Sequence, residues 1–310
     1  MGSRLTALWA RLPGTTRGIV LMLLSTLGFS VMHALIRLVS AELHPVQIAF
    51  FRNLFGLVVF LPWYLRLGFA PLRTRRLKLH VLRAVLNVTA MFAFFTALSL
   101  TPIAQVTALG FTAPIFATLL ATLLLGEVIR LRRWAAIACG FLGALVILRP
   151  GLAPLDAGSL LTLGSALLWG LTLIVIRVLG RSESSLTITS YMNILLTLLS
   201  FVPALFVWRT PGAQTLAWLL AIGVLGTLAQ LAVAQSLKEA ETSVVMPFDF
   251  CKLIWVAALG YLLFGEVPDR FVWLGGLLIF AGATVIAYRE SQLARARTEA
   301  GPPGPGSGTG

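Results

Sequence analysis

Apolar segments of membrane-spanning length follow one another through most of this chain, separated by short loops that carry proline, glycine or basic residues. At 1.5 Å per residue, a helix of about 20 residues crosses the ~30 Å hydrocarbon core of a bilayer. Only 11% of the residues are charged, whereas a soluble domain carries about a quarter. The sequence therefore predicts an all-α polytopic membrane protein. Ten transmembrane helices are expected, near residues 17–39, 46–66, 78–100, 102–124, 132–149, 158–179, 187–208, 215–237, 243–264 and 270–288.

The two halves of the chain read as copies of one another. Gly126-Glu127-Val128, with Trp134 and Gly143 downstream, is matched 139 residues later by Gly265-Glu266-Val267, with Trp273 and Gly282. Further upstream, at an offset of 140, Ser25 and Arg37 correspond to Ser165 and Arg177. Five helices per copy is an odd number, so the second copy should cross the membrane in the opposite sense. Inverted repeats of this kind form a mid-membrane site in many secondary transporters.

This repeat divides the chain into two domains and a tail. The first repeat is expected over residues 17–149, with helices 1–5, and the second over residues 157–289, with helices 6–10. Residues 290–310 end in a run of glycine and proline that cannot bury apolar surface. We therefore expect a disordered cytoplasmic tail there.

Lysine and arginine predict the orientation. If the N-terminus lies inside, the inner segments hold sixteen of these residues and the outer loops hold three, namely Arg149, Arg209 and Arg270. Such a bias places both termini in the cytoplasm, and we expect the inner membrane of a bacterium. The net charge of +13 is explained by this topology, so no nucleic-acid partner is expected.

Ionisable side chains inside the helices are the main candidates for a binding site, because each costs about 2.5–3.5 kcal/mol at bilayer depth. Asp249 and Lys252 lie three residues apart in the ninth helix, on one face. They form either an ion pair that stabilises helix packing or a site where the carboxylate meets a cationic group and the ammonium an anionic one. His33, in the first helix, is either a proton carrier or substrate donor, or a hydrogen bond between helices.

Further candidates for substrate contact are aromatic or amide side chains. Aromatic faces suit a planar substrate, and amides bind ligands or join helices. The residues chosen are Phe111, Trp169, Asn87, Tyr191 and Gln230. Arg52 and Asn53, in the second helix, are weaker candidates for substrate contact.

Two arginines and two glutamates occupy repeat-related positions near helix ends. Arg37 and Arg177 are expected to extend toward the membrane surfaces. Glu127 and Glu266 are expected to cap a helix or to pair with a nearby arginine.

Prolines predict breaks in two helices. Pro247 precedes the Asp249–Lys252 pair, and the corresponding helix of the first half contains Pro114. Proline removes a backbone hydrogen bond and kinks or unwinds a helix. Interrupted helices at corresponding positions of two halves indicate the binding region of a transporter.

Several short motifs lie at the ends and breaks of the helices. They are Phe51-Arg52-Asn53 with Gly56, Leu109-Gly110-Phe111-Thr112-Ala113-Pro114, Leu125-Gly126-Glu127, Leu148-Arg149-Pro150-Gly151, and Pro247-Phe248-Asp249 followed by Gly260-Tyr261-Leu262-Leu263-Phe264-Gly265-Glu266. With these motifs the chain resembles, over about residues 17–289, the drug/metabolite transporter superfamily, and in particular its ten-helix proteins with two EamA-like repeats. Similar proteins include uptake carriers for S-adenosylmethionine or riboflavin and exporters of amino acids. The resemblance implies a central cavity lined by helices 1, 3, 4, 6, 8 and 9, with roles there for Asp249, Phe111 and Trp169.

We therefore expect a secondary transporter that moves a small polar or zwitterionic metabolite by alternating access. The metabolite is expected to be amino-acid-like, nucleoside-like such as S-adenosylmethionine, or riboflavin-like, and either its own gradient or protons drive transport. The alternatives are a passive channel or facilitator and an amino-acid or drug exporter of the same superfamily. The sequence has no ATP-binding loop, no nucleophile–base set and no metal-ligand motif, so neither an enzyme nor a cofactor or metal is expected. In the lipid bilayer the protein is expected to be a monomer or a homodimer.

Overall fold

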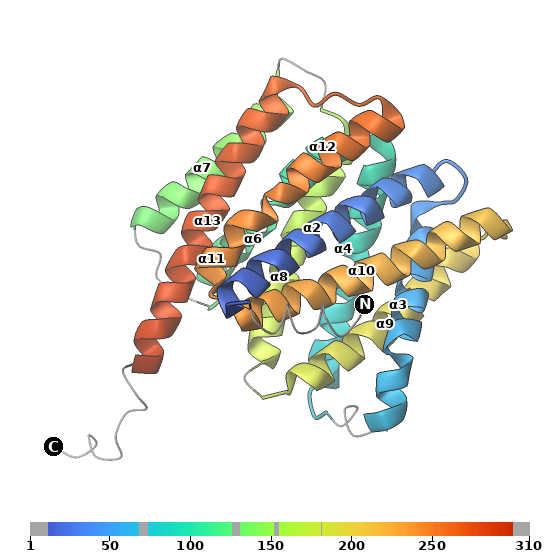
Figure 1. The fold of residues 1–310 in the computed structure, drawn as a ribbon, viewed down its shortest axis with the longest axis horizontal. Coiled ribbons are helices and arrows are strands. Elements are labelled where there is room, and N and C mark those ends of the chain that lie inside the picture. Colours follow the sequence, from blue (N-terminus) through green and yellow to red (C-terminus); the bar gives the residue numbers. More distant parts are fainter. Residues whose placement is uncertain (1–11, 68–73, 126–130, 152–154, 181, 300–310) are drawn as a thin grey trace.

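Helices joined by short loops make up the part of the chain that the computed structural model describes, residues 12–67, 74–125, 131–151, 155–180 and 182–299, and no strand occurs within those ranges (Figure 1). The helices are α2 (Gly14–Val39), α3 (Pro45–Leu67), α4 (Leu77–Leu100), α5 (Ile103–Gly110), α6 (Ala113–Leu125), α7 (Leu131–Leu148), α8 (Ala157–Leu179), α9 (Ser185–Phe206), α10 (Ala213–Glu239), α11 (Thr242–Asp249), α12 (Cys251–Phe264) and α13 (Arg270–Glu299).

Hydropathy and length identify the membrane-spanning helices. Seven helical segments are long enough to cross a bilayer and have a mean hydropathy of at least 1.5, and three shorter apolar helices cover Pro45–Val59, Trp134–Leu148 and Arg270–Ile286. Each of the ten predicted spans corresponds to one of these segments. The prediction of an all-helical, polytopic membrane protein is therefore confirmed.

Two of the predicted helices are broken in the middle, as the prolines indicated. The first break lies at Phe111-Thr112, between α5 and α6, and the second lies at Phe250, between α11 and α12. Phe111 and Phe250 are 139 residues apart in the chain, which is the offset of the sequence repeat. Their ring centroids lie 6.0 Å apart, so the two breaks meet inside the protein.

The unbroken helices pair closely around these breaks. α2 lies along α10, and α4 lies along α8. The broken helices fill the space between the two pairs, because α5 and α6 contact α8, α11 and α12 contact α2, and α5 also contacts α12. Hydroxyl groups join the pairs internally: Ser25 donates to the Ala229 carbonyl at 2.9 Å and Ser165 to the Ala90 carbonyl at 2.7 Å.

α7 and α13 form a third close pair at one side of the bundle (Figure 1). A Cβ atom on Gly143 would lie 2.5 Å from the Gly275 carbonyl oxygen, and one on Gly282 would lie 2.5 Å from the Ala136 carbonyl oxygen. Glycine is required at these positions because the two backbones touch. The small residues of α7 thus make a contact within the monomer.

The last helix differs from its predicted end near residue 288. α13 continues to Glu299, so the predicted start of the tail at Glu290 is wrong. The intervening sequence is rich in arginine, alanine and glutamate and has no glycine or proline before Gly301, and these residues favour helix. The rest of the predicted tail, 300–310, and the Gly126-Glu127-Val128 motif lie outside the described residues.

Candidate functional site

The second helix break brings Asp249 and Lys252 together. Asp249 is the last residue of α11 and Lys252 is the second residue of α12. Lys252 Nζ lies 3.2 Å from Asp249 Oδ1, and the two side chains are 17% and 23% exposed. The predicted shared face is therefore confirmed, and each charge has an opposite charge beside it at bilayer depth.

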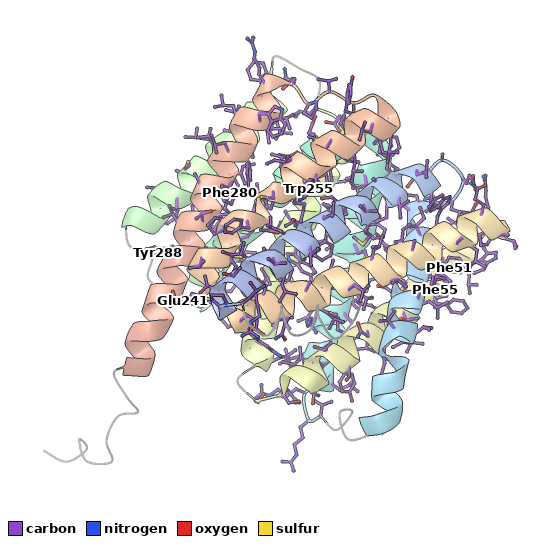
Figure 2. The ribbon with its side chains drawn as sticks, viewed as in Figure 1. Phe51, Phe55, Glu241, Trp255, Phe280 and Tyr288 are labelled. Carbon is purple, nitrogen blue, oxygen red and sulfur yellow. The ribbon has the colours of Figure 1, made fainter. Side chains whose placement is uncertain are left out.

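Aromatic rings from other elements surround this ion pair. Lys252 Nζ lies 5.4 Å from the ring centroid of Phe29 on α2 and 5.3 Å from that of Phe111 at the first helix break. Both distances fall within the range of cation–π attraction. The Phe250 ring packs 4.4 Å from that of Phe280 on α13, which is labelled in Figure 2. This contact holds the second break in place beside the ammonium group.

His33 extends the same cluster toward α4. Its ring centroid lies 5.2 Å from that of Phe94 on α4 and 6.5 Å from that of Phe29, four residues earlier on α2. His33 is 7% exposed, and within the described residues its Nδ1 atom has no hydrogen-bond partner. The ring therefore has an unused polar atom beside the aromatic side chains. We call Phe29, His33, Phe111, Asp249 and Lys252 the central cluster.

The remaining predicted residues are distributed over other parts of the bundle. Asn87 is buried on α4, seven residues before Phe94 and hence on the same face. Trp169 on α8 is 38% exposed, and Gln230 on α10 is exposed. Tyr191 on α9 stacks on His80 of α4, with ring centroids 4.5 Å apart.

Tyr191 thus lies well away from the central cluster. His80 and Phe94 are fourteen residues apart on α4, which corresponds to about 21 Å along the helix axis. The sequence analysis also missed Phe250 and the buried Arg83, which donates to the Ile188 carbonyl at 2.9 Å. Phe250 was recognisable from its 139-residue offset to Phe111.

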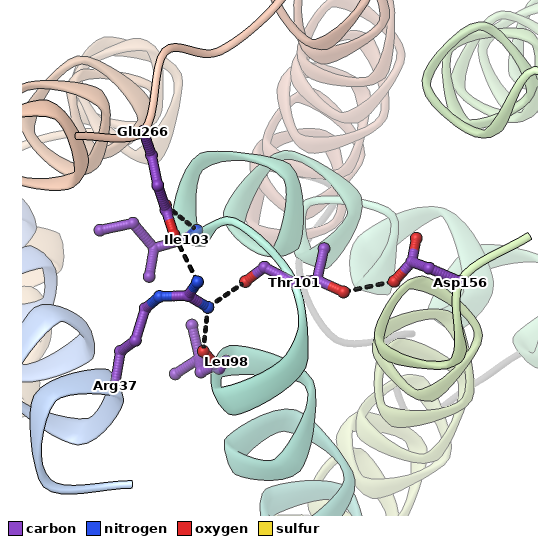
Figure 3. Close-up of polar contacts among 6 residues, drawn as sticks. All are labelled: Arg37, Leu98, Thr101, Ile103, Asp156 and Glu266. Atoms are coloured by element: carbon purple, nitrogen blue, oxygen red, sulfur yellow. Dashed lines mark hydrogen bonds and ion pairs between the residues drawn. The ribbon is translucent and has the colours of Figure 1, made fainter. Parts of the chain in front are cut away.

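A second polar group lies at the end of the bundle where α2, α4 and α12 finish (Figure 3). Arg37 Nη2 lies 2.5 Å from Glu266 Oε1, and Nη1 donates to the carbonyls of Leu98 and Thr101, each at 2.8 Å. Glu266 Oε2 accepts from the Ile103 backbone N–H at 3.0 Å. Arg37 is therefore engaged inside the protein and does not extend to the membrane surface as predicted, whereas the predicted pairing of Glu266 with an arginine is confirmed.

Asp156 connects this group to α8. Its carboxylate accepts a hydrogen bond from Thr101 Oγ1 and another from the Ser159 backbone N–H at 2.9 Å, so it caps the N-terminus of α8. Burial opposes ionisation of Asp156, but the hydrogen bonds from Ser159 and Thr101 outweigh it and lower its pKa. We call Arg37, Leu98, Thr101, Ile103, Asp156 and Glu266 the Arg37 network.

The Arg37 network joins elements that otherwise belong to different helix pairs. Arg37 comes from the α2–α10 pair, whereas Leu98 and Asp156 come from the α4–α8 pair. Glu266 follows Gly265, which ends α12 with a positive φ of 66°. Because glycine adopts this conformation without steric cost, the chain can turn and direct Glu266 toward Arg37.

Comparison with known proteins identifies the family. The profile of the EamA-like transporter family matches residues 16–149 and again residues 156–288. The chain belongs to the EamA-like transporter family. This EamA-like protein is 34% identical over 285 residues to a riboflavin transporter of Vibrio cholerae, an alignment that covers 90% of this chain and 95% of the relative. It is 27% identical over 282 residues to an S-adenosylmethionine uptake transporter of Rickettsia prowazekii, covering 91% and 96%.

One solved crystal structure, described only as that of a protein, has the same fold as this EamA-like protein. The TM-score is 0.60 with 19% identity, over 89% of this chain and 97% of the other. The resemblance to the drug/metabolite transporter superfamily is confirmed by the family match, and so is the expectation of a small-metabolite transporter. Because the family and these relatives are transporters, the chain is not an enzyme.

Proposed function

We propose that this protein carries riboflavin, or a metabolite with a similar planar ring and polar arm, across the bacterial inner membrane by alternating access. The observation that carries this proposal is the position of the Lys252 ammonium between the rings of Phe29 and Phe111, with Asp249 3.2 Å away. The riboflavin transporter of Vibrio cholerae, at 34% identity, supports the same substrate.

The chemistry of the central cluster fits a flavin ring. The rings of Phe29 and Phe111 provide flat apolar faces on which a planar heteroaromatic system can stack. The edge of the isoalloxazine ring carries carbonyl oxygens and an N–H group. Lys252 can donate to such a carbonyl, and Asp249 can accept from the N–H group. Binding would then replace the ion pair by contacts with the substrate.

S-adenosylmethionine is a second candidate, supported by the same ion pair. This metabolite carries a sulfonium, an ammonium and a carboxylate beside a planar adenine ring. The Asp249 carboxylate suits the cationic groups, and Lys252 suits the carboxylate. The S-adenosylmethionine uptake transporter of Rickettsia prowazekii, at 27% identity, is the relative that supports it.

The proposal of alternating access is supported by the division of the chain into two repeats, which we propose to be inverted halves over residues 17–149 and 157–289. Under the repeat offset, α2 corresponds to α8 and α10 corresponds to α4, so the pair α2–α10 is related to the pair α8–α4. Rocking of these pairs about the two helix breaks would open one side of the central cluster at a time. With both termini in the cytoplasm, the Arg37 network lies on the periplasmic side and holds that side closed.

Binding and counterflow test the proposal. Riboflavin is expected to raise the thermal unfolding temperature of the purified protein, and riboflavin preloaded into proteoliposomes is expected to accelerate uptake of labelled riboflavin. A permanently open channel would show no such acceleration. If neither riboflavin nor S-adenosylmethionine stabilises the protein or is taken up, the proposed substrates are refuted.

A further inference from the structure

Arg52 of α3 is a membrane-embedded cation whose hydrogen-bonding capacity is mostly unused. Its Nη1 donates to Asn53 Oδ1 at 3.1 Å, and in the described part of the chain the guanidinium makes no other hydrogen bond and no ion pair. A guanidinium has five N–H donors. Asn53 is itself fixed to α9 through the Ser200 hydroxyl at 3.3 Å and the Leu196 carbonyl at 3.4 Å. The charge is therefore held in position by a neutral amide but is not neutralised.

The guanidinium points into the bundle. A Cβ atom built on Gly226 of α10 would lie 3.4 Å from Arg52 Nε, 3.6 Å from Arg52 Nη2 and 2.6 Å from Met32 Sδ of α2. Arg52 thus lies over Gly226 between α3, α10 and α2, and it is partly exposed there. Met32 is adjacent to His33 and one helical turn from Phe29. The free donors of Arg52 therefore lie beside Met32, which is the chain neighbour of His33.

Two other arginines inside the bundle, Arg37 and Arg83, make contacts of a different kind. Arg37 has a carboxylate and two carbonyls as partners. Arg83 is 6% exposed and donates to the Ile188 carbonyl at 2.9 Å and to Met192 Sδ at 3.2 Å. Their guanidinium groups connect helices. Within the described residues Arg52 donates a hydrogen bond only to its chain neighbour Asn53, so no hydrogen bond between helices explains a charge at this depth.

We propose that Arg52 binds the oxygen-rich arm of the substrate, a chain of hydroxyls or a carboxylate, while Phe29 and Phe111 hold the planar ring. This assignment rests on the proposed function. The planar fork of a guanidinium donates two parallel hydrogen bonds to a carboxylate or to neighbouring hydroxyls. Glycine at position 226 lets α10 approach the guanidinium closely, because a Cβ atom there would already lie 2.6 Å from Met32 Sδ and 3.4 Å from Arg52 Nε. The substrate would therefore be recognised at two points, its ring and its arm.

The test compares ligands with and without the arm on purified full-length protein. Riboflavin has a ribityl arm that lumiflavin lacks, and S-adenosylmethionine has an amino-acid arm that 5′-methylthioadenosine lacks. For the pair that binds the wild-type protein, Arg52→Gln is expected to weaken the arm-bearing ligand about 10-fold or more and to change the arm-free ligand less than ~3-fold. Arg52→Lys should restore binding in part for a carboxylate arm, which accepts a point charge, but not for a hydroxyl arm.

Two further variants keep the test decisive. Gly226→Ala leaves the charge in place, but its methyl group would lie 2.6 Å from Met32 Sδ. It must displace the methionine beside the guanidinium, and it should weaken the arm-bearing ligand selectively, even if Arg52→Gln does not fold. Arg83→Gln is the matched control, and it should lower the unfolding temperature and affect both ligands of a pair equally. The inference is overturned if Arg52→Gln and Gly226→Ala weaken the binding of both ligands of a pair equally, or weaken the binding of neither ligand. The proposed function would remain intact in both cases. If none of the four ligands binds the wild-type protein, the proposed substrates and the role of Arg52 both fail.

Discussion

Replacing Glu266 by glutamine should open the end of the bundle that the Arg37 network is proposed to close. The variant removes one carboxylate from a contact of 2.5 Å between side chains that are 21% and 13% exposed, and Arg37 keeps its two carbonyl acceptors. One charge-assisted contact of this kind is worth about 2 kcal/mol, less than a fully buried pair because water reaches both side chains. If the contact exists only in the closed state, its loss changes the ratio of open to closed protein ~30-fold.

A single cysteine reports this change. Phe94→Cys, next to His33, provides the reporter after Cys139 and Cys251 are replaced by alanine. A membrane-impermeant maleimide applied from the side of the Arg37 network should label this position ~30-fold faster in Glu266→Gln than in the protein with Glu266, because the labelling rate follows the open fraction.

The control variant breaks a neighbouring ion pair. Arg149 Nη2 lies 2.6 Å from Asp269 Oδ2 at the same end of the bundle. This pair joins the end of α7 to the start of α13, and those helices are held together along their length by glycine contacts. Asp269→Asn should therefore leave the labelling rate nearly unchanged. Equal rates in the Glu266 and Asp269 variants, or no increase in either, would contradict the assignment of the Arg37 network as a closure.

Four other predictions concern the central cluster, packing and pH. Asp249→Asn should reduce transport about 10-fold or more without unfolding the protein, because it removes one charged contact of the cluster; wild-type uptake in this variant would exclude Asp249 from the site. His33→Ala should abolish the dependence of uptake on a pH gradient, and unchanged dependence would assign proton coupling to another group or to none. Gly143→Val should cost about 1–3 kcal/mol in thermal unfolding because its side chain has no space, whereas Gly164→Ala, where a Cβ meets no atom within 4 Å, should cost nothing. Asp156 has a lowered pKa in the folded protein, so its contribution to stability is present above the unfolded-state pKa and is lost as the pH falls through the lower folded-state pKa. Asp156→Asn should lower the unfolding temperature at pH 7 and remove this acid sensitivity; an unchanged acid transition would show that other carboxylates cause it.

Properties that depend on a few consecutive residues were predictable from the sequence. Hydropathy averages over one helix at a time, so all ten spans were found. The break near Pro247 and the pairing of Asp249 with Lys252 were also local, since backbone geometry and a spacing of three residues determine them. The breaks were predicted from Pro114 and Pro247, which do not align in the repeat, so the corresponding positions of the breaks at Phe111 and Phe250 were not predicted.

Contacts between distant helices were not predictable in the same way. Glu266 was expected to pair with some arginine, but nothing in the sequence selected Arg37, 229 residues away. Tyr191 has the hydropathy and depth of a site residue, yet α9 directs it to His80. Arg83 was overlooked because its position near the start of a span resembles that of the basic residues in the adjoining loop. In each case the choice of partner is made by the packing of helices against one another, which hydrophobic periodicity does not specify.

The two helix breaks are equivalent in the backbone but differ in their chemistry. The repeat counterparts of Asp249 and Lys252, at the 139-residue offset, are Gly110 and Ala113, whereas Phe250 has its counterpart in Phe111. After duplication, only the second half thus kept or acquired charges beside its break. If the central cluster binds the cargo as proposed, both members of the Asp249–Lys252 ion pair come from the second half, and the cargo has one preferred orientation during transit. A change of substrate preference should accordingly begin with substitutions in α11 and α12.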